Sequence, residues 1–121
     1  KNKDILLMIV GSPQDYTRAE EVASYWGDNK LNLCGIMNPR ESAFAISNAT
    51  IFIGHDSGPM HLAEATGVPC VGISGPLQKP KVWFPYGDIH KIIHNSKSIF
   101  DITVDEVITN ILDLREEILN Q

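Results

Sequence analysis

The sequence predicts an α/β domain built on a parallel sheet with helices on both faces. Its apolar segments are continuous runs, as in strands that are covered on both sides. These runs alternate along the chain with segments of helical periodicity, and that alternation predicts a parallel sheet with right-handed crossovers. The length of 121 residues, with 43% hydrophobic and 21% charged residues, is typical of one globular domain. We therefore expect a single domain over residues 1–121.

The first strand is expected at residues 5–10, where six apolar residues follow one another. The helix after it is expected to begin with a capping box, in which Thr17 and Glu20 each accept from the other's backbone N–H, and to stop at Gly27. A short second strand is expected at residues 31–34. The apolar stripe of this first helix comprises Ala19, Val22, Ala23 and Trp26.

The second helix is expected to begin after Asn38, which can cap it. Pro39 then takes the first helical position, where a missing N–H costs nothing, and Glu41 lies three residues after the cap. A strand at residues 51–54 is expected to turn directly into a third helix that runs to Gly67. The buried face of the second helix is expected to consist of Ala45, Ile46 and Ala49.

The last part of the chain predicts two strands and a terminal helix. The strands are expected at residues 70–73 and 90–94, and the segment between them is a long connection without periodicity, which in a compact domain is usually functional. A capping box of Thr103 and Glu106 is expected to open the terminal helix. Its predicted buried stripe comprises Val104, Val107, Ile108, Ile111 and Ile118.

Composition excludes several classes of function. The net charge of −5 and the absence of a Lys/Arg cluster argue against nucleic-acid binding, which needs a basic face. No apolar run approaches the roughly 20 residues of a membrane span. Residues 1–4 run straight into the first strand, so a signal peptide is not expected, and the missing initial Met indicates a piece of a longer protein. Cys34 and Cys70 are interpreted as reduced core thiols, with a disulfide as the alternative.

The strongest candidate site lies at residues 54–61, where small and polar residues connect a predicted strand to a predicted helix. The free N–H groups and the positive end of that helix suit a phosphate. Gly58 permits close approach, Ser57 and His61 can donate to an anion, and Asp56 can bind a ligand hydroxyl or act as a base. The alternative is structural: Ser57 is only a helix cap and His61 only a surface residue.

Two further strand ends point to the same ligand edge. Asp15, after the first strand, can accept hydrogen bonds from a ribose, or it is a turn or helix-start acid. Met37, after the second strand, can form the floor of a purine pocket, or it packs as a hydrophobic staple before the helix. The aromatics of residues 83–86 can stack on a sugar or base, or cover the sheet edge. The histidines lack the spacing of metal ligands, so no metal site is expected.

The chain carries four motifs in order: Asp56-Ser57-Gly58-Pro59-Met60-His61-Leu62-Ala63, Gly67-Val68-Pro69, Gly75-Pro76 and Pro85-Tyr86-Gly87. Their order and spacing resemble those of glycosyltransferase family 9, the ADP-heptose:lipopolysaccharide heptosyltransferases. Gly11 and Arg40-Glu41 also look like family features. The resemblance covers essentially the whole chain. It implies a GT-B fold of two Rossmann-like domains, of which this chain is most of the C-terminal, donor-binding one.

The resemblance also implies roles for single residues. Asp56, Ser57, Gly58 and His61 would hold the pyrophosphate and sugar of an ADP-sugar. Asp15 would contact the adenosine ribose, and Met37 would lie by the adenine. The family works without a metal or other cofactor at this site. Its catalytic base lies in the N-terminal domain, so the catalytic residues are expected outside this chain, which alone would be inactive.

The function expected from these observations is donor binding in a bacterial, inverting glycosyltransferase that moves heptose from ADP-heptose to the lipopolysaccharide inner core. Its partners would be the nucleotide-sugar and, through the N-terminal domain, a glycolipid acceptor. The protein is expected in the cytoplasm, with peripheral contact to the inner membrane. Two alternatives stay open: a non-catalytic nucleotide-binding module whose aromatic loop serves a protein partner, and a GT-B transferase that uses a UDP-sugar.

Overall fold

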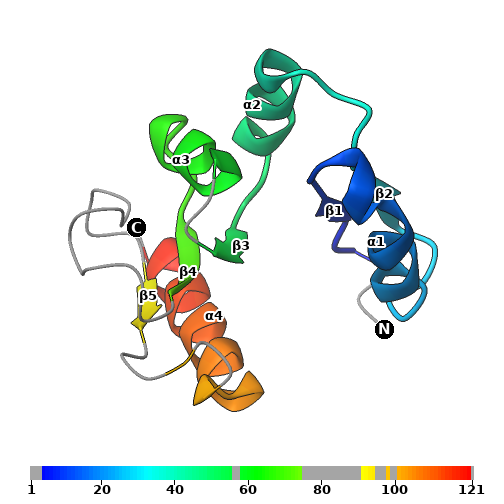
Figure 1. Cartoon of the computed structure of the whole chain (residues 1–121). Helices are drawn as coiled ribbons and strands as arrows, with labels where there is room; N and C mark the ends of the chain where they lie inside the picture. Colours follow the sequence, from blue (N-terminus) through cyan, green and yellow to red (C-terminus); the bar gives the residue numbers. More distant parts are fainter. Residues whose placement is uncertain (1–3, 56–57, 75–90, 95–97, 99–100, 121) are drawn as a thin grey trace. The chain divides into compact units, whose positions relative to one another are not determined.

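The computed structural model describes residues 4–55, 58–74, 91–94, 98 and 101–120 (Figure 1). The chain divides into two compact units, Lys1–Ser42 and Ala43–Gln121, and each is described by itself. Strands and helices alternate through most of the chain, and every strand pairing is parallel. The α/β class and the parallel pairing expected from the sequence are therefore confirmed, whereas a single domain over residues 1–121 stays a prediction.

The first unit holds a two-stranded parallel sheet of β1 (Leu7–Ile9) and β2 (Lys30–Asn32). A 3-10 turn, η1 (Pro13–Asp15), leads into α1 (Tyr16–Ala23), which connects the two strands. β1 is shorter than the apolar run that predicted it, because residues 5 and 6 lie outside the ladder and are about half exposed. The Lys30 ammonium donates to the Ala23 carbonyl and so closes the end of α1.

The predicted capping box of Thr17 and Glu20 is wrong, because the helical segment begins earlier. The Asp15 carboxylate accepts from the backbone N–H and the hydroxyl of Ser12, at 3.0 and 2.9 Å, and this fixes the start of η1. Thr17 therefore lies inside α1. The Glu20 carboxylate accepts instead from the Asn32 amide at 3.1 Å, a contact across 12 residues of sequence.

The apolar stripe of α1 is only partly confirmed. Ala19 and Ala23 are buried, whereas Val22 is 55% exposed. Trp26 is half-buried beyond the end of α1, and its indole N–H donates to the Ile5 carbonyl at 3.1 Å. The buried residues of α1 are thus its two alanines, and the larger apolar side chains Val22 and Trp26 remain exposed or half-buried.

The predicted start of the second helix is confirmed. α2 (Pro39–Ser47) begins directly after Asn38, whose side-chain oxygen accepts from the Glu41 N–H at 2.8 Å. The Glu41 carboxylate in turn accepts from the Asn38 N–H at 3.0 Å, which completes a reciprocal cap. Ile46 is buried, while the two alanines predicted beside it are half-buried.

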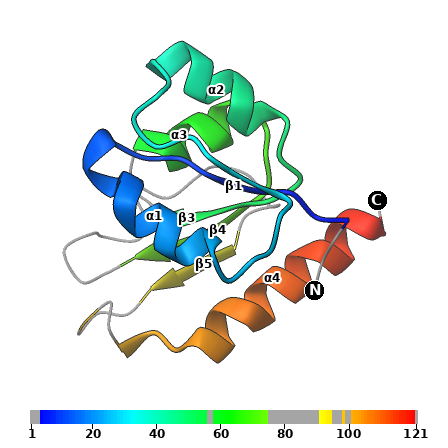
Figure 2. The same cartoon turned by 90° about the vertical axis from the view of Figure 1, so that its right-hand side faces the viewer.

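The second unit holds a three-stranded parallel sheet in the order β3 (Phe52–His55), β4 (Cys70–Ser74), β5 (Lys91–His94). Two helices pack on it, α3 (Gly58–Ala65) and α4 (Val104–Leu119). They lie on opposite faces of the sheet, as Figure 2 shows. Helices on both faces, expected from the sequence, are thus present in this unit.

Side-chain contacts separate the two faces of β4. Val71 and Ile93 pack against Leu114 of α4 and form a buried cluster on one face of the sheet. Gly72, the next residue along β4, lies under α3: a Cβ built on it would come 3.0 Å from the Met60 sulfur and 2.8 Å from the end of Ile92. Because neighbouring residues of a strand point to opposite faces, these contacts assign every residue of β4 to one helix or the other.

The terminal helix has the predicted start, and Val107, Ile111 and Ile118 of the predicted stripe face the sheet. The Glu106 N–H donates to the Thr103 hydroxyl at 3.1 Å and the Glu106 carboxylate accepts from the Thr103 N–H at 3.0 Å, so the predicted capping box is confirmed. Val104 and Ile108, however, are 73% and 47% exposed, which makes that part of the predicted stripe wrong. The residues of α4 that face the sheet are Val107, Ile111, Leu114 and Ile118.

Candidate functional site

The second unit gathers its candidate residues at one edge of the sheet. Since β3, β4 and β5 are parallel, their carboxyl ends meet at the same edge, with His55, Ser74 and His94 as the last residues. α3 begins at Gly58, three residues after β3 ends at His55; Figure 1 shows the two elements. This is the edge at which open parallel sheets bind ligands, so the location predicted for residues 54–61 is confirmed as a strand-to-helix junction.

Gly58 leaves the start of α3 open. It is exposed, and within the part of the chain that the structure describes a Cβ built on it would meet no atom closer than 4 Å. The first N–H groups of a helix have no partner within the helix, and the helix dipole adds partial positive charge there. A negatively charged group can therefore approach this backbone closely, as phosphates do at such helix starts.

His61 lies one turn into α3 and is half-buried. Met60 beside it is buried against Gly72, so the sheet fixes the rotation of the helix about its axis and with it the direction in which position 61 projects. Asp56 and Ser57, the two other predicted ligands of this junction, lie outside the described residues. Their roles stay predictions.

Small residues on β4 let α3 sit close to the sheet. Cys70, Gly72 and Ser74 alternate along one face of the strand, beneath α3. The Cys70 thiol donates to the Val68 carbonyl at 3.2 Å. Burial, and then the charge of Glu64, raise the pKa of Cys70 to about 12, so this thiol stays protonated and takes part in packing rather than in nucleophilic chemistry.

The first unit brings two of the predicted loops together. The Gly35 N–H donates to the Gly11 carbonyl at 2.9 Å, which continues the pairing of β1 and β2 past their ends. Gly35 has φ +75°, and a Cβ on it would lie 2.5 Å from the Pro13 Cα. Only glycine fits this contact. The loop that carries Asp15 and the loop that carries Met37 therefore lie side by side at the carboxyl edge of this sheet.

Asp15 is exposed and already has a structural task. Its carboxylate accepts from the N–H and hydroxyl of Ser12, as a helix-start acid does. This confirms the structural alternative for Asp15, and the contact to a ribose stays a prediction. Met37 is half-buried directly before the Asn38 cap, where its proposed contact with a purine likewise stays a prediction.

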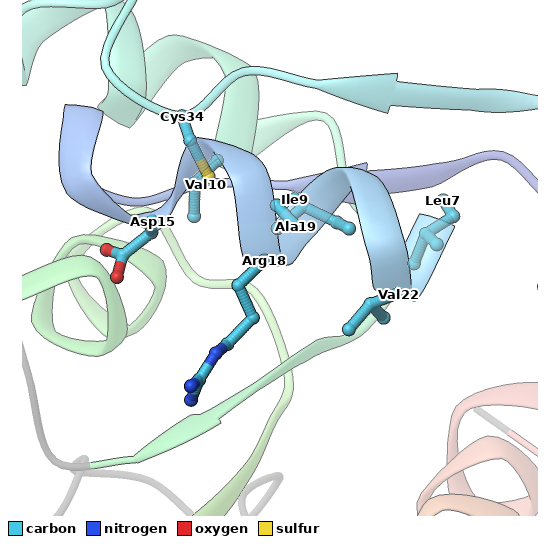
Figure 3. A pocket seen from close by; sticks show the side chains of 8 residues that line it. All are labelled: Leu7, Ile9, Val10, Asp15, Arg18, Ala19, Val22 and Cys34. Atoms are coloured by element: carbon cyan, nitrogen blue, oxygen red, sulfur yellow. The ribbon is translucent and has the colours of Figure 1, made fainter. Parts of the chain in front are cut away.

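A hollow of about 260 Å³ lies beside α1 within the first unit (Figure 3). Its walls are largely apolar, with Asp15 and Arg18 as the charged residues, and Figure 3 shows both side chains extending on the same side of α1. Cys34 also lines it; burial, and then the charge of Asp15, raise the pKa of this thiol. The apolar lining consists of Leu7, Ile9, Val10, Ala19 and Val22.

Sequence reasoning missed Arg18 and Cys34 as neighbours of Asp15. The spacing of three residues between Asp15 and Arg18 was the available signal, because residues three apart at a helix start share one side. For Cys34 the signal was its position at the end of the second strand, opposite Gly11: a Cβ on Gly11 would lie 3.3 Å from the Cys34 sulfur and 2.9 Å from the Asp15 carboxylate.

Three other sequence predictions concern metals, membranes and the aromatic loop. Within the described part of the chain, no three His, Cys, Asp or Glu side chains lie together as metal ligands would. None of the described helices has the length and apolarity needed to cross a bilayer. The aromatic residues 83–86 and His90 lie outside the described residues.

The fold and the two sheet edges define the class of this chain: a parallel α/β protein with a helix start open to an anionic ligand at the carboxyl ends of its strands. Comparison with known proteins then identifies the family. The family described as Glycosyltransferase family 9 (heptosyltransferase) matches residues 1–104, and the chain belongs to it.

Relatives agree with this assignment. The chain is 32% identical over 89 residues to lipooligosaccharide heptosyltransferase 2 of Haemophilus influenzae, a match that covers 70% of this chain and 25% of the relative. A glycosyl transferase family 9 structure from Veillonella parvula superposes with a TM-score of 0.83 at 23% identity, over 94% of this chain and 37% of that one. The structure of the E. coli ADP-heptose lps heptosyltransferase II superposes with a TM-score of 0.76 at 24% identity, over 93% of this chain and 37% of that one. The chain thus spans about a quarter of the curated relative's length.

Proposed function

We propose that this chain is the donor-binding part of an inverting glycosyltransferase that transfers heptose from ADP-heptose to the inner core of lipopolysaccharide. The observation that carries the proposal is the start of α3: Gly58 opens it to a ligand at the carboxyl edge of the β3–β4–β5 sheet. Membership of glycosyltransferase family 9 supports the reaction class. The choice of donor draws on the E. coli relative, which is described as an ADP-heptose transferase.

The diphosphate of the donor is assigned to the start of α3. In glycosyl transfer the bond between the sugar and the diphosphate breaks, and negative charge grows on the leaving oxygen. Backbone N–H groups and a helix dipole fixed in advance stabilise that charge without reorganisation. Gly58 admits the phosphate to the backbone, and His61 supplies an imidazole one turn further on. Asp56 and Ser57 are proposed as further ligands of the diphosphate and sugar.

The adenosine is assigned to the loops of the first unit. Asp15 and Met37 follow the two strands of one parallel sheet, and their loops are joined by the hydrogen bond from Gly35 to Gly11. A carboxylate accepts hydrogen bonds from ribose hydroxyls, and a thioether packs well against the flat face of a purine. Asp15 would keep its bonds to Ser12 while it binds the ribose, because a carboxylate has two oxygens with about four acceptor positions.

We propose the following reaction for the donor placed in this way. An acceptor hydroxyl attacks the anomeric carbon on the face opposite the diphosphate, the bond to the diphosphate breaks with its electrons, and ADP leaves while the anomeric configuration inverts. The hydroxyl proton passes to a base that we place in a second, N-terminal domain of the GT-B type. That domain would also bind the glycolipid acceptor, at the cytoplasmic face of the inner membrane.

A titration of the 121-residue chain with ADP, UDP and ADP-heptose, followed by amide NMR shifts, tests the proposal. We expect ADP and ADP-heptose to shift the amides of Gly58, His61 and Met37 more strongly than UDP does. Substitution of His61 by Ala should weaken the response, whereas Thr109→Ala, on the exposed face of α4, serves as the matched control.

Each contrary result has a distinct meaning. A stronger response to UDP would replace the ADP-sugar by a UDP-sugar. Shifts at the start of α3 that survive His61→Ala unchanged would remove His61 from the site. The absence of any response to all three nucleotides at millimolar concentration would refute donor binding by this chain and favour a different role for its sheet edge.

A further inference from the structure

Ser74, the last residue of β4, carries a polar group that the fold does not explain. The residue is 2% exposed, and its hydroxyl oxygen has no hydrogen-bond partner within the part of the chain that the structure describes. Buried polar groups in proteins are nearly always hydrogen-bonded, so an exception calls for an explanation. A ligand could supply the missing hydrogen bond, because a hydroxyl can both donate and accept.

The sheet register places Ser74 beside the start of α3. Gly72 lies under Met60, and Ser74 follows two residues later on the same face of β4. Two residues of strand cover about 6.6 Å, which equals about four residues of helix. Because α3 connects the parallel strands β3 and β4, it runs antiparallel to them. The Ser74 side chain therefore lies about one turn before Met60 along the helix axis, just beyond Gly58, where α3 begins.

We propose that Ser74 is a further ligand-binding residue of this site and that its hydroxyl donates a hydrogen bond to a diphosphate oxygen of the donor. This inference rests on the proposed function. A bound diphosphate supplies the acceptor that the buried hydroxyl lacks, and a charged acceptor makes the bond stronger than a neutral one would. The same anion would then be held by the backbone at the start of α3 from one side and by Ser74 from the sheet.

The position of Ser74 in the row of small residues explains its size but not its hydroxyl. Cys70 and Gly72 are small for packing reasons, since α3 lies directly on them. Alanine at position 74 would satisfy the same packing and would bury no polar group. A role in binding accounts for the hydroxyl. Substitutions that keep the side chain small but remove or weaken the hydroxyl can therefore test this role. The hydroxyl is buried in this structure, so the proposal requires that ligand binding exposes it.

Binding of ADP, inorganic pyrophosphate and adenosine to the 121-residue chain and to Ser74→Ala tests this assignment. We expect Ser74→Ala to weaken ADP and pyrophosphate binding about tenfold, because a hydrogen bond to a charged group is lost. Adenosine should bind the variant as tightly as the wild type. The ligand-free variant should melt no lower than the wild type, since an unpaired buried hydroxyl has been removed.

Two further variants complete the experiment. Ser74→Cys keeps a side chain of similar size with a weaker donor, so we expect an intermediate loss of ADP affinity, and it replaces Ser74→Ala should that variant not fold. Ser47→Ala removes an exposed hydroxyl of α2 and should leave ADP binding unchanged. Unchanged ADP affinity in both Ser74 variants, with ADP still bound at Gly58, overturns the role of Ser74 alone. A wild-type chain that binds neither ADP nor pyrophosphate overturns the proposed function and this inference together.

Discussion

Truncation of Leu114 tests which face of α4 forms the core of the second unit. Leu114 is 0% exposed and packs with Val71 and Ile93, so Leu114→Ala leaves a cavity between α4 and the sheet. Buried Leu→Ala changes cost 2–5 kcal/mol, and the complete burial of this side chain argues for a loss of about 3 kcal/mol or more. The matched control is Leu112→Ala on the same helix. Leu112 is 52% exposed, so its truncation loses about half of a full burial term and encloses no cavity, at a cost of about 1 kcal/mol.

The measurement is urea unfolding followed by far-ultraviolet circular dichroism, with the free energies compared at constant denaturant slope. The two variants share helix, residue type and helix propensity, so their difference reports burial alone. Equal losses for the two variants would refute the reasoning, and a larger loss for Leu112→Ala would mean that the opposite face of α4 packs on the sheet.

Two more predictions concern β4. Gly72→Ala should lower the free energy of unfolding by about 1–3 kcal/mol, because the added methyl meets Ile92 and Met60. Gly58→Ala should change the free energy of unfolding little, because no described atom lies within 4 Å of the added methyl. Thermal melts of both variants check this difference. Cys70 should resist a thiol reagent in the folded chain and react once urea is added. Its folded pKa of about 12 lies above the ordinary value of 9.0, so the folded state is also expected to lose stability as pH rises above about 9 and the unfolded thiol ionises. Rapid labelling of folded Cys70 would contradict both expectations.

Local signals in the sequence predicted helix starts well. The caps at Asn38 and Thr103 need only a side chain and a backbone group three residues apart, and both are present. The predicted capping box of Thr17 and Glu20 did not form, because other residues make the contacts that it needs. An earlier acid, Asp15, already fixes the helix start on Ser12, and a residue of β2 takes the carboxylate of Glu20. A local cap at Ser12 and a longer-range contact between Glu20 and Asn32 thus replaced the predicted capping box.

The buried face of α4 shows a different limit. The helix carries apolar residues over a wide arc, so its periodicity predicts that it is amphipathic without saying which part of the arc meets the sheet. Val104 and Ile108 continue the arc on its exposed side, and Leu114 lies at its buried side. The sheet makes that choice through the positions of Val71 and Ile93, and these come from elsewhere in the sequence.

The candidate site divides in the same way. Gly58 in the second unit and the loops of Asp15 and Met37 in the first unit were predictable, because strand ends and helix starts are local features and each parallel sheet gathers its own at its carboxyl edge. Arg18 as a neighbour of Asp15 needed the course of α1 as well.

Ser74 needed the register between β4 and α3, which follows from the contact between Gly72 and Met60. In the sequence, Ser74 is one more small residue before a loop. The contact between Gly72 and Met60 sets the register from which we infer that the Ser74 hydroxyl lies near the start of the helix. The same packing that explains why Gly72 has no side chain therefore explains how a residue 16 positions after Gly58 can belong to its site.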